Sequence, residues 1–171
     1  MFLHCFSPSV VERPKAWDPL VTITGYWFLN EKPETIRNKT PEDEIPQGLE
    51  QFIHRAWGNR KKIVYIGFGS VIVEDLPKMT KTIVKAVSDA EVYAVVSAGW
   101  SGQESKASNE KGPEVVKKNE LFTENMFYIK SVLHDWLFPK IDAVVHHGGI
   151  GTTAASLRGM YSNNSTSLLQ V

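Results

Sequence analysis

The stretch that decides the fold reads Ala143-Val144-Val145-His146-His147-Gly148-Gly149-Ile150-Gly151-Thr152-Thr153-Ala154-Ala155-Ser156-Leu157-Arg158. Its apolar start, 143–145, predicts a buried strand, and 152–158 predicts a helix. The turn between them holds three glycines within four positions, so its backbone can come close to a ligand. The first N–H groups of the helix and the positive end of its dipole would point at that ligand. The stretch therefore predicts a phosphate site, with an ordinary strand-to-helix turn capped by threonine as the alternative. The paired histidines favour the phosphate site, because they add donors at the same strand end.

Apolar runs alternate with helical segments through the rest of the chain. Strands are predicted near 63–68, 92–97, 126–129 and 142–146, with an amphipathic helix over 75–90. The continuous apolar run at 63–68 is typical of a parallel sheet that is covered on both faces. The alternation predicts a three-layer α/β domain with a Rossmann-like, mainly parallel sheet.

Ligands of such sheets bind beyond the carboxyl ends of the strands. Three predicted strand ends carry small or polar residues, at 69–70, 97–100 and 146–149. We therefore expect these three turns to meet at one edge of the sheet.

The segments outside this alternation are less regular. Residues 21–29 are β-branched and aromatic and predict a strand, whereas 30–46 and 101–120 predict a linker and a long exposed loop. Residues 161–167 are polar and predict a tail without regular structure.

Two short helices are also predicted outside the strands. Helical spacing over 49–57 predicts an amphipathic helix, with Trp57 in the core. A second, shorter helix is predicted to be capped by Asp135, closed by Pro139 and buried through 136–138.

Composition excludes several classes of protein. The chain has 171 residues with 19 basic and 19 acidic side chains, and this balance argues against a general nucleic-acid binder. The single cysteine, Cys5, cannot form an internal disulfide, and no Cys/His spacing is typical of zinc, so no metal is expected. The first six residues lack the basic start of a signal peptide, and no run has membrane-spanning length. A cytoplasmic location is expected, with peripheral membrane attachment in a full-length form.

The His-His-Gly-Gly-x-Gly-Thr-Thr pattern at 146–153, followed by Leu157-Arg158, resembles the nucleotide-sugar signature of GT-B glycosyltransferases, specifically the sterol 3-β-glucosyltransferases. The resemblance covers roughly nine-tenths of the chain and ends after Gly159. It implies the C-terminal, donor-binding half of the GT-B fold in incomplete form. An interdomain connection and linker would occupy 1–46, a partial nucleotide-sugar-binding domain 47–160, and a divergent tail 161–171.

The resemblance also assigns residues to the donor, a UDP-sugar and most simply UDP-glucose. His147 and Ser70 would contact the diphosphate, and the backbone at Val132 would read the uracil ring. His146 is then expected to pack or bond locally. The complete set expected to bind the donor is Ser70, Val132, His147, Gly148, Gly149, Gly151, Thr152 and Thr153. No separate cofactor is implied.

The implied reaction is transfer of glucose from UDP-glucose to the 3-hydroxyl of a sterol or another lipid acceptor. The family's Gly-Thr-Arg-Gly-Asp motif and its sugar-binding Asp-Gln pair are absent, so the chain resembles a form truncated at both ends and no residue is assigned as general base. The isolated chain is expected to be inactive and prone to self-association through an unpaired sheet edge. A non-catalytic, nucleotide-binding remnant is the alternative. A dehydrogenase is excluded, because 66–72 lacks the third glycine of a dinucleotide-binding turn.

Overall fold

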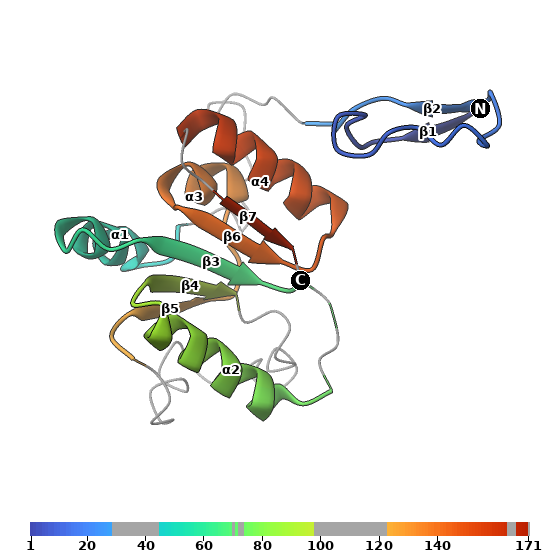
Figure 1. Ribbon diagram of the computed structural model, residues 1–171. Coiled ribbons are helices and arrows are strands. Elements are labelled where there is room, and N and C mark those ends of the chain that lie inside the picture. The colour runs from blue at the N-terminus through green and yellow to red at the C-terminus, as the bar shows by residue number, and fades with distance from the viewer. Residues whose placement is uncertain (29–44, 70, 72–73, 98–122, 164–166, 171) are drawn as a thin grey trace, which may run out of the picture. The chain divides into compact units, whose positions relative to one another are not determined.

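The computed structural model describes residues 1–28, 45–69, 71, 74–97, 123–163 and 167–170 (Figure 1). The chain divides into two compact units, 1–39 and 40–171. The boundary between the two units falls within the predicted linker, 30–46.

In the first unit, two short strands, β1 (Phe2–His4) and β2 (Val21–Ile23), pair in parallel. The guanidinium of Arg13 donates to the carbonyl oxygens of Val21, Trp17 and Asp18, which holds the connection between the two strands together. The strand predicted over 21–29 is wrong beyond Ile23, because the chain turns at Gly25, whose φ is +80°. Strand β1 was not predicted.

The second unit is built on a five-stranded, wholly parallel sheet in the order β5-β4-β3-β6-β7 (Figure 1). Its strands are β3 (Ile63–Gly67), β4 (Tyr93–Ser97), β5 (Met126–Ile129), β6 (Ala143–His146) and β7 (Ser167–Gln170). The first four confirm the predicted strands to within one residue at each end. The α/β class and the parallel sheet are confirmed as well.

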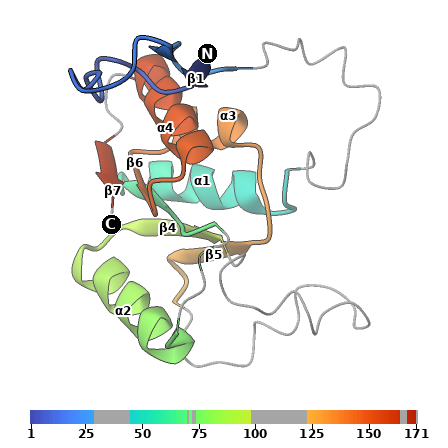
Figure 2. The same cartoon turned by 90° about the vertical axis from the view of Figure 1, so that its right-hand side faces the viewer.

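Helices cover both faces of this sheet (Figure 2). Helix α2 (Leu76–Asp89) lies on one face, and its first turn is capped by the side chain of Asp75, which accepts the Lys78 N–H at 2.9 Å. The other face carries α1 (Leu49–Gly58), α3 (His134–Leu137), the 3₁₀ helix η6 (Phe138–Lys140) and α4 (Ile150–Asn163). The change of face between α2 and α4 is the doubly wound arrangement.

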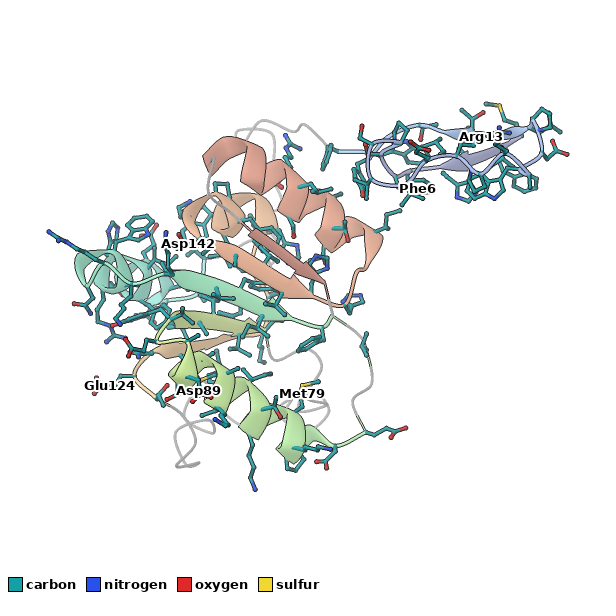
Figure 3. The ribbon with its side chains drawn as sticks, viewed as in Figure 1. Phe6, Arg13, Met79, Asp89, Glu124 and Asp142 are labelled. Atoms are coloured by element: carbon teal, nitrogen blue, oxygen red, sulfur yellow. The ribbon has the colours of Figure 1, made fainter. Side chains whose placement is uncertain are left out.

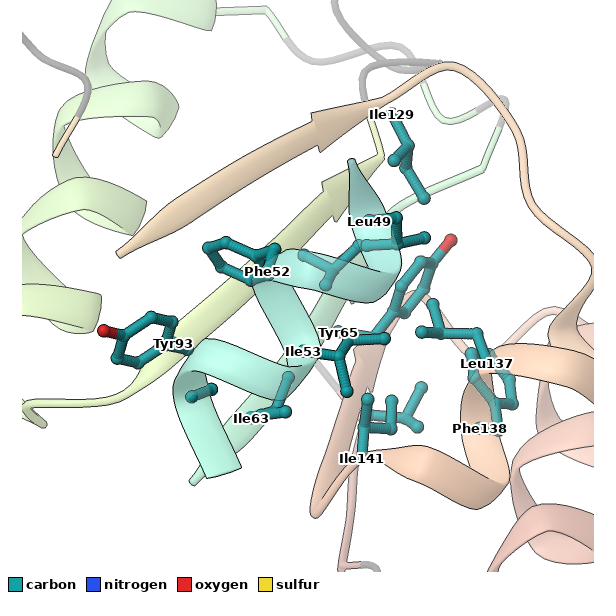
Figure 4. Close-up of a cluster of buried hydrophobic side chains, with 13 residues drawn as sticks. Leu49, Phe52, Ile53, Ile63, Tyr65, Tyr93, Ile129, Leu137, Phe138 and Ile141 are labelled. Atoms are coloured by element: carbon teal, nitrogen blue, oxygen red, sulfur yellow. The ribbon is translucent and has the colours of Figure 1, made fainter. Parts of the chain in front are cut away.

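The two faces bury two separate hydrophobic clusters, because successive strand residues point to opposite sides. The larger cluster joins α1, α3 and η6 to one face of the strands, with Phe138 fully buried against Tyr65 (Figure 4). The smaller cluster joins Ile83 and Val87 of α2 to the opposite face, at Ile66 and at neighbouring residues of β4 and β5. Burial on both faces explains why the strands read as continuous apolar runs.

Asp142, which precedes β6, ties the amino ends of the two central strands together (Figure 3). One carboxylate oxygen accepts the backbone N–H of Ile63 at 2.9 Å, and the other accepts the ammonium group of Lys62 at 2.8 Å. The bond to Ile63 joins residues 79 positions apart in the chain.

Two predictions about the helices are wrong. Trp57 is 46% exposed, because it lies next to Ala56 at the end of α1 and turns away from the buried face to pack against His54. Asp135 does not cap α3: it lies in the first turn, the capping position is Leu133, and no side chain caps the helix. Leu137 and Phe138 are fully buried as predicted.

The predicted irregular tail is also wrong in part. Helix α4 extends to Asn163, and the following strand β7 pairs in parallel with β6, from Ala143↔Ser167 to His146↔Gln170. Strand β6 is therefore paired on both sides, with β3 and with β7.

Candidate functional site

The strand order reverses between β3 and β6, which pair as neighbours in the middle of the sheet (Figure 1). From β3 the chain builds the sheet in one direction through β4 and β5, and from β6 in the other direction through β7. At this reversal the connecting helices leave toward opposite faces, and ligands of doubly wound sheets bind there. Gly67 and His146 are paired across the two strands at this end, so the turns that follow them leave the sheet side by side.

The imidazole ring of His147 lies between these two turns. A Cβ atom on Gly69 would lie 2.8 Å from Cε1 of the ring, and a Cβ on Gly149 would lie 2.5 Å from Nε2. Any side chain at either position would therefore displace the ring. Gly69 also has a φ of +58°, which other residues rarely adopt. The two glycines together form the seat of His147.

One nitrogen of this ring has no partner. Nδ1 of His147 is buried and makes no hydrogen bond within the part of the chain that the structure describes. A buried polar atom without a partner costs free energy, and such atoms gather at sites that bind something else. The ring therefore has an unused bonding capacity at the point where ligands of this fold bind.

The N-terminus of α4 lies directly after this seat. The first backbone hydrogen bond of the helix runs from the Thr153 N–H to the Gly149 carbonyl at 2.9 Å, so the amides of residues 150–152 precede it. No acidic residue occupies the first turn, and the space around Gly151 is open. Free amides, the helix dipole and an imidazole thus share one small region, and this combination suits an anion.

The two threonines of the predicted site are not equivalent. The hydroxyl of Thr153 donates to the Gly149 carbonyl at 3.0 Å, so its hydrogen is used inside the helix. Of the two hydroxyls, that of Thr152 is therefore the better candidate to donate to a ligand. Thr153 retains only acceptor capacity on its side chain.

His146 behaves as predicted, because it bonds locally. Its side chain is fully buried, and Nδ1 accepts the backbone N–H of Gly148 at 3.0 Å. Burial lowers the pKa of His146, and the nearby His147 lowers that pKa further. Burial also lowers the pKa of His134, with Asp135 opposing the shift and His146 adding to it.

His134 belongs to a ring cluster that the sequence did not indicate. Its imidazole stacks on Phe138 at 4.5 Å between ring centroids and meets Tyr65 edge to face at 5.7 Å. Burial raises the pKa of Tyr65, while a hydrogen bond with the side chain of Ser97 opposes the shift. The alternation of buried residues along β3 could have placed Tyr65 on this face, but no local pattern places the ring of His134 beside it.

Two of the predicted site residues remain to be accounted for. Ser70 is outside the described residues. Val132 follows β5 and packs half-buried against the larger hydrophobic cluster, so its side chain is used in packing and only its backbone could meet a ligand. Surface hollows of about 420 and 500 Å³ lie along α2 and beside Lys140–Asp142, and neither is lined by His147 or by the turn at 148–152.

Over the described ranges, no three His, Cys, Asp or Glu side chains gather in a way that could hold a metal ion. In the same ranges, no helix has both the length and the apolar character to cross a bilayer.

Comparison with known proteins gives similar sequences in fungi. The chain is 47% identical over 159 residues to a sterol 3-beta-glucosyltransferase of Cryptococcus neoformans, 47% over 157 residues to one of Aspergillus fumigatus, and 43% over 157 residues to one of Neurospora crassa. Each match covers 92% of this chain and 10% of the relative, so the chain spans about a tenth of the length of these proteins. No family model matches the chain.

Solved structures agree on the fold. The glycotransferase of kitacinnamycin has a TM-score of 0.50 at 12% identity, with 88% of this chain and 30% of that chain covered. The glycosyltransferase SnogD from Streptomyces nogalater has a TM-score of 0.50 at 17% identity, with 92% and 35% covered. The predicted resemblance is confirmed: the chain is similar to one segment of sterol 3-beta-glucosyltransferases and has the fold of part of a GT-B glycosyltransferase.

Proposed function

We propose that this chain is the donor-binding part of a glycosyltransferase and binds a UDP-sugar, UDP-glucose first among them, between β3 and β6. The observation that carries the proposal is the seat of His147. A ring with an unpartnered, buried nitrogen lies between Gly69 and Gly149, beside the free amides of α4.

The diphosphate would be held chiefly by the backbone. Amides of the first turn of α4 and the hydroxyl of Thr152 donate to phosphate oxygens, while His147 donates from the strand side. When the sugar leaves, negative charge grows on the UDP, so donors fixed in advance stabilise the transition state more than the ground state. The residues proposed to contact the donor are those predicted from the sequence. Val132 would act through its backbone. Thr153 has only the acceptor capacity of its hydroxyl oxygen to offer, because its N–H and its hydroxyl both donate to the Gly149 carbonyl.

The acceptor side of the reaction is proposed from the names of the relatives, which are sterol 3-beta-glucosyltransferases. Glucose would pass to the 3-hydroxyl of a sterol or a related lipid, bound by a part of the whole protein outside this sequence. No side chain of this chain is proposed as the general base. With such an acceptor, the enzyme would act in the cytoplasm, at the surface of a membrane that supplies the sterol.

Titration calorimetry with UDP and UDP-glucose tests the donor site. Loss of one hydrogen bond to a charged group predicts about 10- to 100-fold weaker UDP binding for His147→Ala, and about 2- to 10-fold weaker binding for Thr152→Ala. His54→Ala is the matched control, because His54 is an exposed histidine on α1. Equal UDP binding by the wild type and both site variants would contradict the proposed site.

A second arm separates binding from catalysis. Purified chain is incubated with labelled UDP-glucose and ergosterol, and we expect no steryl glucoside above the level of His147→Ala. UDP binding without transfer is the expected result for a donor-binding segment, whereas clear transfer would show that the chain carries its own acceptor site and base.

A further inference from the structure

His146 occupies a position where an apolar residue would be the ordinary choice. It lies on β6 two residues after Val144, on the face of the larger hydrophobic cluster, and both side chains are fully buried. Its Nε2 atom is buried and makes no hydrogen bond within the described residues. Burying an imidazole with one unpaired nitrogen costs stability, so we expect the other nitrogen to make a bond that serves the structure or the site.

That other nitrogen closes the turn around His147. Nδ1 of His146 accepts the N–H of Gly148 at 3.0 Å, and Gly148 has a φ of +82°, which turns its amide back toward the strand end. This hydrogen bond joins the residues directly before and after His147, so it fixes the backbone on both sides of residue 147. In this conformation its ring lies against Gly69 and Gly149.

The bond also sets the protonation of His146. An accepting Nδ1 carries no proton, so the neutral ring carries its proton on Nε2, and a protonated ring would lose the bond to Gly148. The titratable groups that act on this ring are His147 at its own strand end and His134 from α3, and both repel a positive charge. The residue paired with it on β3, Gly67, is uncharged, and Asp135 acts on His134. The buried side chain of α4, Ser156, donates to the Thr152 carbonyl.

We infer that His146 is a positioning residue for the donor site: as a neutral imidazole it holds the 147–149 turn through Gly148 and so seats His147 for the phosphate. The part of this inference that concerns the donor rests on the proposed function. The two neighbouring histidines then have separate duties. One ring shapes the turn from inside the fold, and the other meets the ligand.

Two variants and a ligand-free measurement test this inference. Asn at position 146 can offer its amide oxygen where Nδ1 lies, but it does not titrate, whereas Leu fills the space and offers no acceptor. Amide exchange at Gly148 and nuclear Overhauser contacts from the His147 ring to Gly69 and Gly149 report the turn directly by NMR. UDP titrations at pH 7.5 and 5.5 report the consequence for binding, and His54→Ala again serves as the control.

We expect His146→Asn to keep the Gly148 protection, the ring contacts and UDP affinity within about threefold at pH 7.5, and His146→Leu to lose the protection and about tenfold in affinity. Between pH 7.5 and 5.5 the affinity of the wild type should fall relative to that of His146→Asn. Changes in UDP are common to both proteins and cancel in this ratio. The Asn variant thus keeps the test decisive even if the Leu variant does not fold.

Unchanged Gly148 exchange and ring contacts in His146→Leu would overturn the inference, and so would an affinity ratio that stays constant through the pH at which NMR shows the His146 ring taking up a proton. If no protein binds UDP while the NMR differences appear as expected, the donor proposal fails and the control of the turn by His146 stands. If UDP binds equally to all three proteins, the donor site stands and the inference fails.

Discussion

The replacement Gly149→Ala tests whether His147 depends on its glycine seat. The new Cβ would lie 2.5 Å from Nε2 and 2.9 Å from Cε1 of the His147 ring. The first distance is about 0.9 Å short of ordinary van der Waals contact, so the ring must move or rotate away from its rotamer at a cost of about 0.5–1.5 kcal/mol. Once moved, it no longer reaches a bound phosphate in the same geometry. The loss of that bond predicts about 10- to 100-fold weaker UDP binding.

The assay is a double-mutant cycle by titration calorimetry. If Gly149→Ala acts through the ring, it should weaken UDP binding in the wild type and have almost no effect in a His147→Ala background, where the ring is gone. Gly58→Ala is the matched control, because nothing lies within 4 Å of the Cβ it adds and its site is on α1. The same fold loss in both backgrounds would refute the explanation through His147, and so would unchanged binding in the wild-type background.

Two further predictions concern stability. Asp142→Ala should lower the free energy of unfolding in urea by about 1–3 kcal/mol, because the N–H of the buried Ile63 loses its acceptor. Lys62→Ala should cost less than about 1 kcal/mol, because its ammonium group is exposed, and equal losses for the two variants would contradict this ranking. Burial lowers the pKa of His134 and of His146, so at acidic pH the unfolded chain binds more protons than the folded chain. The free energy of unfolding should therefore fall as the pH drops below about 6.5, the ordinary pKa of histidine. Thermal melting from pH 7.5 to 5 checks this: His134→Phe should flatten the curve, and a wild-type curve already flat would contradict the explanation.

The strands of the second unit could be predicted because each is buried on both faces. Under that condition an apolar run such as 63–67 marks a strand without any help from alternation. The glycine-rich turn after β6 could be predicted for a similar reason, since close approach of the backbone demands glycine in any context. Both patterns are local, so they can be recognised in the sequence without knowing how the elements pack.

The errors arose where neighbours in space decide the outcome. Trp57 fits the helical spacing, but the buried face of α1 ends at Ala56. Strand β7 pairs with β6, and no short-range pattern in the sequence predicts this pairing. The difference between Thr152 and Thr153 depends on which hydroxyl reaches the Gly149 carbonyl. The seat of His147 requires Gly69, which comes from another strand, so the sequence could identify the residue but not what holds it.

The position of β3 in the sheet has a consequence for the order in which the chain can fold. One of its neighbours, β4, begins 30 residues later, but the other, β6, pairs through residues such as Ala143, which are made about 80 residues after β3. At about 5–20 residues per second, a ribosome needs about 4 to 16 seconds to make this intervening segment. During that time one edge of an apolar strand has no partner, and the bond from Ile63 to Asp142 that would close it cannot form. The nascent chain is therefore most vulnerable to aggregation in this interval, and a chaperone that covers β3 should raise the yield of folded protein.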